Sequence, residues 1–162
     1  KENGLEINKD VDERYDPLKS TVAACKYLRK AYAKFGNWTN VAASYNRGMA
    51  GFNRALENQQ VESYYDLLLN EETSRYIFRL LAIKEIFENP DKFGFDISNE
   101  HLYEAEKLSY VEVNEDIKDL VLFAKDQGIN YKLLKRHNPW LRDKDLKVKK
   151  NKTYRIAIPV NE

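Results

Sequence analysis

The sequence has few features that could cross-link the chain or hold it in a lipid bilayer. It contains one cysteine, Cys25, which cannot form an internal disulfide, so cysteine content leaves the redox compartment open. Cys25 lies among apolar helical positions, and we expect its thiol to be buried. No apolar run approaches the roughly 18 residues that a membrane-spanning helix requires. The sequence shows no signal-peptide pattern and begins with Lys-Glu-Asn rather than methionine, which suggests that an upstream segment has been removed.

An excess of charge of either sign is also missing. The 162 residues include 27 basic and 26 acidic side chains, and the net charge is +1. A nucleic-acid-binding domain normally carries a strong basic excess, so we expect no nucleic-acid partner. A hydrophobic content of 43% and a charged content of 33% are typical of a globular protein. The length is sufficient for one domain, or for one domain with a small module.

The first 95 residues have the apolar periodicity of helices. Asp16 is a suitable cap and Pro17 a favourable first residue for the first helix. Asn37 or Thr39 caps the second, and Asn70, followed by two acids, suits the start of the last. That last helix is apolar around more than half of its circumference, so we expect it to be buried on several sides. The expected helices cover residues 17–35, about 38–46, about 50–58 and 71–88.

The composition changes after Phe95. Residues 96–107 are polar and are predicted to form a linker, and strand-like alternation appears in the remaining chain. We predict a strand at 108–113, helices at 116–127 and 131–137, and a closing strand at 153–159. The two strands are too far apart in sequence for a tight hairpin, so both helices should pack on one face of the sheet. The expected fold class is therefore mainly α, followed by a small βααβ module.

The stretch at 41–52, VAASYNRGMAGF, has the composition of a binding surface. Its small residues let a helix sit close to its neighbours, and Gly48 and Gly51 let the backbone turn. At this junction Tyr45 supplies a flat apolar ring, and Asn46 supplies hydrogen-bonding groups. A sugar, which has apolar C–H faces and polar edges, matches this combination. The alternative is a helix end with a glycine cap and no ligand.

Six short motifs occur in one order along residues 3–95. They are Val11-Asp12-Glu13-Arg14, Ser20-Thr21-x-Ala23-Ala24-x-x-Tyr27-Leu28, Phe35-Gly36-x-Trp38, Ala43-x-Tyr45-Asn46-x-Gly48, Glu72-Thr73-x-Arg75-Tyr76 and Asn89-Pro90. Together they resemble the C-terminal part of the catalytic domain of lytic transglycosylases of family 23, particularly the membrane-bound lytic murein transglycosylase D type. The tail resembles a LysM module through its βααβ order and the pattern Leu134-x-x-x-Asn138-Pro139. The implied domains are a partial transglycosylase domain over 1–95, a linker over 96–107 and a LysM-like module over 108–162.

The resemblance implies a lysozyme-like helical fold, with its N-terminal part missing, and peptidoglycan glycan strands as the partner. Enzymes of this family cleave the bond between N-acetylmuramic acid and N-acetylglucosamine and form 1,6-anhydromuramic acid. One glutamate acts first as acid and then as base, while the muramyl C6 hydroxyl attacks C1. Neither a metal ion nor a cofactor is expected. The implied location is the periplasm or cell envelope, with any membrane attachment made through an anchor outside this chain, such as an outer-membrane anchor of the full-length protein.

The resemblance assigns four site residues. Tyr45, Asn46 and Gly48 are expected to bind the sugar, and Tyr76 is expected to hydrogen-bond the catalytic glutamate. In the family, that glutamate belongs to a Glu-Ser motif upstream of Gly4-Leu5. It is not in this sequence, so we expect the chain to be inactive alone. Three positions depart from the family pattern. Ser44 stands where alanine is frequent, and Asn70 and Phe78 stand where proline is frequent.

Two other functions stay open at this point. A non-catalytic protein could hold peptidoglycan or another glycan in the same groove and tail. A helical interaction module with no glycan role would also fit the composition. A Glu-Ser motif followed by Gly-x-x-Gln immediately upstream of Lys1 would favour the enzyme, and its absence would favour the binding protein.

Overall fold

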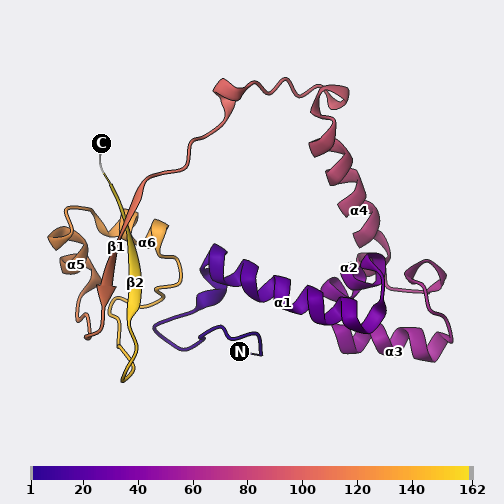
Figure 1. Ribbon diagram of the computed structural model, residues 1–162, viewed down its shortest axis with the longest axis horizontal. Coiled ribbons are helices and arrows are strands. Elements are labelled where there is room, and N and C mark those ends of the chain that lie inside the picture. Colours follow the sequence, from indigo (N-terminus) through magenta and orange to yellow (C-terminus); the bar gives the residue numbers. More distant parts are fainter. Residues whose placement is uncertain (1, 161–162) are drawn as a thin grey trace. The chain divides into compact units, whose positions relative to one another are not determined.

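The computed structural model describes residues 2–160, which form two compact units. The central unit consists of residues 25–103. The terminal unit combines residues 2–24 with residues 104–160, so it is built from both ends of the chain. Figure 1 shows the elements of each unit, with α1 (Pro17–Phe35) running from the terminal into the central unit.

The elements of the central unit are helical and follow the predicted order. After α1 come α2 (Trp38–Arg47), α3 (Met49–Gln59) and α4 (Glu71–Glu88), with the 3-10 turns η2 (Tyr64–Asp66), η3 (Pro90–Phe93) and η4 (Asn99–His101). The Asn37 side chain caps α2 by accepting a hydrogen bond from the Asn40 amide at 2.8 Å. The Asn70 side chain caps α4 by accepting from the Thr73 amide at 3.4 Å. Both caps agree with the sequence, because such side chains satisfy the N–H groups that a helix start leaves unpaired.

A small apolar core joins α2, α3 and α4. The Tyr64 ring of η2 is buried in it, and its hydroxyl donates to the Thr73 carbonyl at 3.1 Å and to the Ser74 carbonyl. These bonds fix η2 against the first turn of α4, as expected for a buried tyrosine that needs a partner for its hydroxyl. The buried residues of this core are Ala43, Phe52, Tyr64 and Ile77.

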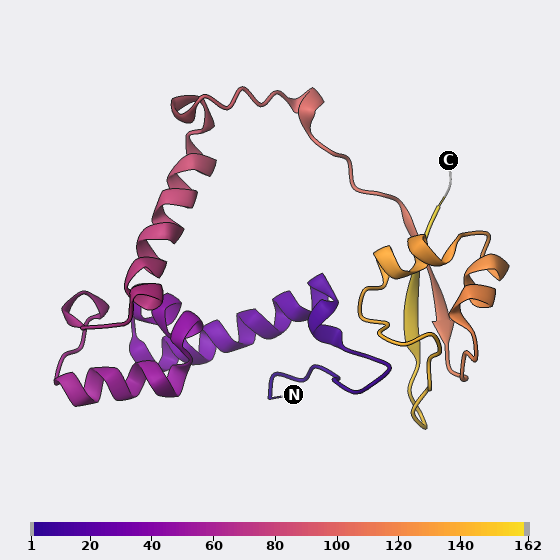
Figure 2. The same cartoon turned by 180° about the vertical axis from the view of Figure 1, so that it is seen from behind.

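Helix α4 is more exposed than its composition suggests. Among its described residues only Thr73 and Ile77 are buried, whereas Phe78 is 57% and Phe87 is 81% exposed. Figures 1 and 2 show that α4 leaves the other helices of the central unit after its first turns. The expectation of burial on several sides is therefore wrong here, because composition expresses a preference for burial and neighbouring elements decide it. The Cys25 thiol on α1 is exposed rather than buried for the same reason.

Residues 108–160 adopt the predicted order of strand, helix, helix and strand. The strands β1 (Leu108–Val113) and β2 (Tyr154–Pro159) pair antiparallel, with Leu108 opposite Pro159 and Val113 opposite Tyr154. Between them in sequence lie α5 (Leu120–Asp126) and α6 (Tyr131–His137). Both helices cover the same face of the sheet, as expected, because Leu120 and Leu134 are buried in one cluster with Ile156.

The first residues of the chain pack on this βααβ module. Val11 is fully buried in the core of the module and forms an isolated bridge with Leu141. The Asp12 amide donates to the Trp140 carbonyl at 2.9 Å, just before the 3-10 turn η1 (Glu13–Tyr15). Residues near the start of the chain thus share a core with the tail. The division into domains over 1–95, 96–107 and 108–162 stays a prediction.

Candidate functional site

The junction between α2 and α3 lies at Gly48, whose φ is +83°. A Cβ at this position would meet no atom within 4 Å, so glycine is required by the backbone conformation rather than by space. The turn ends α2 immediately after Tyr45 and Asn46. The Tyr45 ring is 49% exposed and rests edge-on against Tyr27, with 5.5 Å between ring centroids. Tyr27 is itself held by a 2.7 Å hydrogen bond from its hydroxyl to the Ser44 carbonyl.

Asn46 is oriented by α4. The buried Thr73 hydroxyl donates to Asn46 Oδ1 at 3.0 Å, which leaves the amide N–H groups of Asn46 without a partner among the described residues. Arg47 reaches the same region and donates to Asn70 Oδ1 at 3.3 Å. An open pocket of about 390 Å³ lies here, and it is lined by Asn46, Arg47, Gly51, Asn70, Glu72 and Thr73. The pocket can therefore offer amide and guanidinium donors to the hydroxyl and carbonyl oxygens of a ligand.

Tyr76 lies one turn beyond Thr73 on α4, at the i+3 position, and therefore on the same side of the helix. Its half-buried ring packs against the core cluster that contains Phe52 and Tyr64. It does not line the pocket beside Asn46. Of the three residues expected to bind the sugar, Asn46 lines this pocket. Tyr45 and Gly48 do not line it, although they lie close to Asn46 in the sequence. The role of Tyr76 as a partner of a glutamate stays a prediction.

Among the glutamates that the structure describes, Glu6 and Glu13 have the least exposed side chains, and both are held in their charged form. Burial disfavours the Glu6 carboxylate, but hydrogen bonds from Lys149, Lys152 and Tyr154 outweigh that effect and lower its pKa to about 2. For Glu13, burial is likewise outweighed by the Glu6 amide and the Lys19 ammonium, and its pKa is also lowered. A general acid at neutral pH needs a raised pKa. Neither side chain is suited to donate a proton to a glycosidic oxygen.

Glu72 is the glutamate that lines the pocket beside Asn46. Its carboxylate is exposed and lies 3.5 Å from the Arg79 guanidinium. It has no apolar enclosure of the kind that raises the pKa of a catalytic carboxyl. The position of the general acid stays a prediction.

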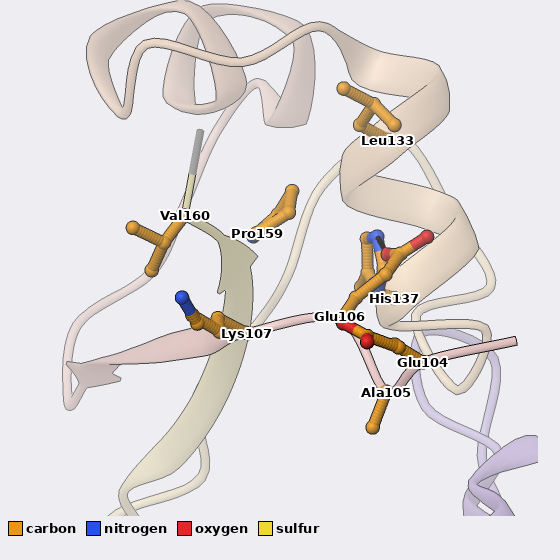
Figure 3. A pocket seen from close by; sticks show the side chains of 8 residues that line it. All are labelled: Glu104, Ala105, Glu106, Lys107, Leu133, His137, Pro159 and Val160. Carbon is orange, nitrogen blue, oxygen red and sulfur yellow. Dashed lines mark ion pairs between the residues drawn. The ribbon is translucent and has the colours of Figure 1, made fainter. Parts of the chain in front are cut away.

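The βααβ module carries a groove of its own (Figure 3). It has a volume of about 460 Å³ and lies among the residues that precede β1, the end of β2 and helix α6. Glu106 spans two basic groups, with 2.9 Å from one oxygen to Arg136 and 2.9 Å from the other to His137 Nε2. The residues that line the groove are Glu104, Ala105, Glu106, Lys107, Leu133, His137, Pro159 and Val160.

Among residues 2–160, one group of carboxylates has the spacing of a metal site. Ligand atoms of Asp10, Asp143 and Asp145 lie within 4.8 Å of one another. Lys9 Nζ is 2.9 Å from Asp143 and, through this contact above all, lowers the pKa of that carboxyl. Because a lysine already supplies the positive charge, the group is explained as an ion-pair cluster.

The two parts of the chain match two domain families. Residues 1–68 match the Transglycosylase SLT domain, and residues 109–162 match the Soluble lytic transglycosylase C-terminal LysM-like domain. The resemblance found in the sequence is therefore confirmed for both segments. None of the described helices is long and apolar enough to cross a bilayer.

Two curated relatives make the resemblance more specific. The chain is 25% identical over 148 residues to the membrane-bound lytic murein transglycosylase D of Escherichia coli strain K12. The protein of the same description from Escherichia coli O6:H1 matches to the same extent. The match covers 88% of this chain and 32% of each relative. The chain thus spans about a third of the length of these relatives.

Sequence reasoning identified Asn46 but not the residue that positions it. The sequence indicates a helix start at Asn70 and a family motif at Glu72-Thr73, but it does not indicate that Thr73 binds Asn46 or that Glu72 lines the same pocket. The sequence shows only a threonine after two acids at a helix start, and its burial is known from the structure alone. The contact itself joins residues 27 positions apart, and no periodic pattern predicts it.

Proposed function

We propose that the chain is the C-terminal part of the catalytic domain of a peptidoglycan lytic transglycosylase, followed by a glycan-binding tail. The intact protein cleaves the bond between N-acetylmuramic acid and N-acetylglucosamine and forms 1,6-anhydromuramic acid during cell-wall remodelling. The general acid is a glutamate upstream of residue 1. In agreement with this, Glu6 and Glu13 have lowered pKa values, and the glutamate beside Asn46 is exposed.

The residues of this chain bind and orient the sugar. Asn46, fixed by Thr73 at 3.0 Å, directs its free amide N–H groups to oxygens of the sugar beside the cleaved bond. The exposed ring of Tyr45 packs on a C–H face of a neighbouring sugar. Gly48 makes the turn that presents both side chains. Tyr76 donates its hydroxyl to the upstream glutamate, and this bond orients the acid for proton transfer.

One observation carries the proposal. The Asn46 carboxamide is held by a buried threonine at the edge of a pocket, in the segment that matches the Transglycosylase SLT domain. A structural helix end would need no such bond from a second helix. The arrangement is instead suited to holding the amide in one orientation for a ligand.

The test uses the protein extended upstream to include the proposed glutamate. Purified sacculi are digested, and 1,6-anhydromuropeptides are measured by mass spectrometry for the wild type, Asn46→Ala and Asn53→Ala. Asn53 lies on α3 outside the pocket and binds Glu57 at 2.5 Å, so it is the matched control. Asn46→Ala should lower turnover by about a hundredfold, as loss of a positioned polar contact does, and Asn53→Ala should leave it unchanged. Equal turnover of all three proteins would refute the site.

A second function is a non-catalytic peptidoglycan-binding protein. The lowered pKa values of Glu6 and Glu13 fit this function as well as the first, because neither carboxyl is suited to act as an acid. Under this hypothesis the extended protein binds sacculi but releases no anhydro product, and the same assay separates the two functions. For both functions we propose a location in the periplasm or cell envelope, with any anchor outside this chain.

A further inference from the structure

A second pocket lies on the face of the βααβ module that its helices leave uncovered. Side chains alternate across a strand, and Ile156 of β2 faces the helices. The neighbouring Arg155 and Ala157 therefore face the other way, together with Tyr110, which pairs with Ala157 across the sheet. These residues line a pocket of about 290 Å³, which the first residues of α1 close on one side. It is distinct from the groove in Figure 3, although His137 touches both.

The floor of this pocket is buried, and its Asn138 side chain is fully hydrogen-bonded. Ala157 and Trp140 are almost fully buried, and Asn138 is completely buried. The Asn138 amide donates to the Ala157 carbonyl at 2.7 Å and to the Leu134 carbonyl at 2.9 Å, and its oxygen accepts from the Ala157 amide at 2.8 Å. The floor therefore provides an apolar contact and a fixed shape.

Arg155 is the charged group on the wall that has no ionic partner. Its guanidinium carbon lies 4.4 Å from the centroid of the Tyr110 ring, and no carboxylate among residues 2–160 lies within ion-pair distance of it. Arg136, which also lines the pocket, is bound to Glu106 at 2.9 Å. Among the described residues that line the pocket, Asp16 is the carboxylate, and it accepts hydrogen bonds from two backbone amides of α1 at 3.0 Å. The ring holds the guanidinium in place by a cation–π contact and leaves its N–H donors free.

We propose that this pocket binds a carboxylate-bearing unit of peptidoglycan, with Arg155 as the partner of the carboxylate and Tyr110 and the floor as its apolar contacts. A guanidinium pairs with a carboxylate through two parallel hydrogen bonds. The volume suits one sugar ring or a dipeptide. The choice of polymer rests on the proposed function. Peptidoglycan has two sources of such a carboxylate, which are the lactyl group of a muramyl sugar and the peptide attached to it.

The test is a nuclear magnetic resonance titration of the whole chain, observed at the Arg155 Nε–H and at the Tyr110 and Ala157 amides. The probes are N-acetylmuramic acid, its methyl ester and the dipeptide Ala-Glu. The ester keeps the ring and removes the charge, so it should bind at least about tenfold more weakly than the acid if a charge-assisted pair is formed. A stronger response to the acid than to the dipeptide assigns the lactyl group, and the reverse assigns the peptide. Equal affinity for acid and ester, or no response to either anion, overturns the proposal.

Three variants locate the effect. Arg155→Gln should reduce affinity for the anion about tenfold or more, and Arg155→Lys should retain only part of it, because lysine keeps the charge and loses the planar fork. Arg142→Gln is the matched control, because Arg142 also lies over a tyrosine, at 4.1 Å from the Tyr15 ring, but does not line the pocket. Unchanged binding by Arg155→Gln overturns the proposal.

The outcome is separable from that of the proposed function. Anion binding at Arg155 without release of anhydromuropeptides by the extended protein would refute the catalytic function alone. Release of anhydromuropeptides together with normal anion binding by Arg155→Gln would refute this pocket alone.

Discussion

Glu6→Gln should destabilise the terminal unit at neutral pH and have little effect in acid. Glu6 Oε1 lies 2.6 Å from Lys149 Nζ, the other oxygen binds Lys152, and the Tyr154 hydroxyl donates to it at 3.0 Å. Although burial opposes the charge, these donors lower the pKa from 4.5 to about 2. Glutamine keeps the size of the side chain and can still accept from Tyr154, but it cannot pair with the lysines.

The magnitude follows from the linkage between proton binding and folding. A pKa difference of about 2.5 corresponds to roughly 3.4 kcal/mol, at about 1.36 kcal/mol per pH unit. The two lysine side chains are 63% and 34% exposed, so solvent screening reduces this value, and we expect a loss of about 1–2 kcal/mol. The folded-state pKa lies below the unfolded value. The stabilisation is therefore complete above about pH 4.5 and disappears as the pH falls through about 2.

Urea denaturation measures this effect when it is followed by the fluorescence of Trp140, which is buried in the terminal unit. A Trp38→Phe background removes the second tryptophan. Glu115→Gln is the control, because Glu115 is an exposed acid of the same unit. The difference in unfolding free energy between wild type and Glu6→Gln should be largest at pH 7 and should narrow toward pH 2. A difference that does not change with pH, or that equals the effect of Glu115→Gln, would refute the reasoning.

Three further predictions concern the central unit. Tyr76→Phe in the extended protein should lower turnover on sacculi while changing the unfolding free energy by only about 1 kcal/mol, the net value of one hydrogen bond. Full turnover by this variant would show that Tyr76 has no role in the site. Gly48→Ala should destabilise the unit by about 1 kcal/mol or more because its φ is +83°. Gly51 lies inside α3, and a Cβ there would make only an ordinary contact with Arg47 at 3.7 Å. Gly51→Ala should therefore stabilise the unit by up to about 1 kcal/mol. The melting temperatures of the two variants should shift in opposite directions. The exposed Cys25 thiol should react with a disulfide reagent under native conditions, whereas a reaction that requires denaturant would show that the thiol is buried.

Features fixed by neighbouring residues could be predicted from the sequence. Asn37 and Asn70 cap their helices with the backbone amides three positions ahead, so the helix starts follow from local chemistry. The order of strands and helices in the tail follows equally from the change of apolar period. The Tyr45-Asn46 junction could be placed because glycine is the residue that best tolerates the positive φ that ends α2.

Features that depend on distant neighbours could not be predicted. The bridge between Val11 and Leu141 joins segments 130 positions apart, and nothing in the polar character of residues 1–15 indicates a partner in the tail. The bond from Thr73 to Asn46 is decided by how α4 meets α2. The exposure of Phe87 shows the same dependence, because its apolar character alone predicted burial. In each case the outcome was set by the packing partner rather than by the local sequence.

The shared core of the chain's beginning and end imposes an order on folding. Val11 is made before the residues that cover it, because Leu141 and Trp140 leave the ribosome more than a hundred residues later. The central unit has its own core and can fold during that interval. The terminal unit then forms only when the segments before and after the central unit meet. Bringing them together costs loop-closure entropy before any contact forms. Completion of this unit should therefore be the last and slowest step in the folding of the chain.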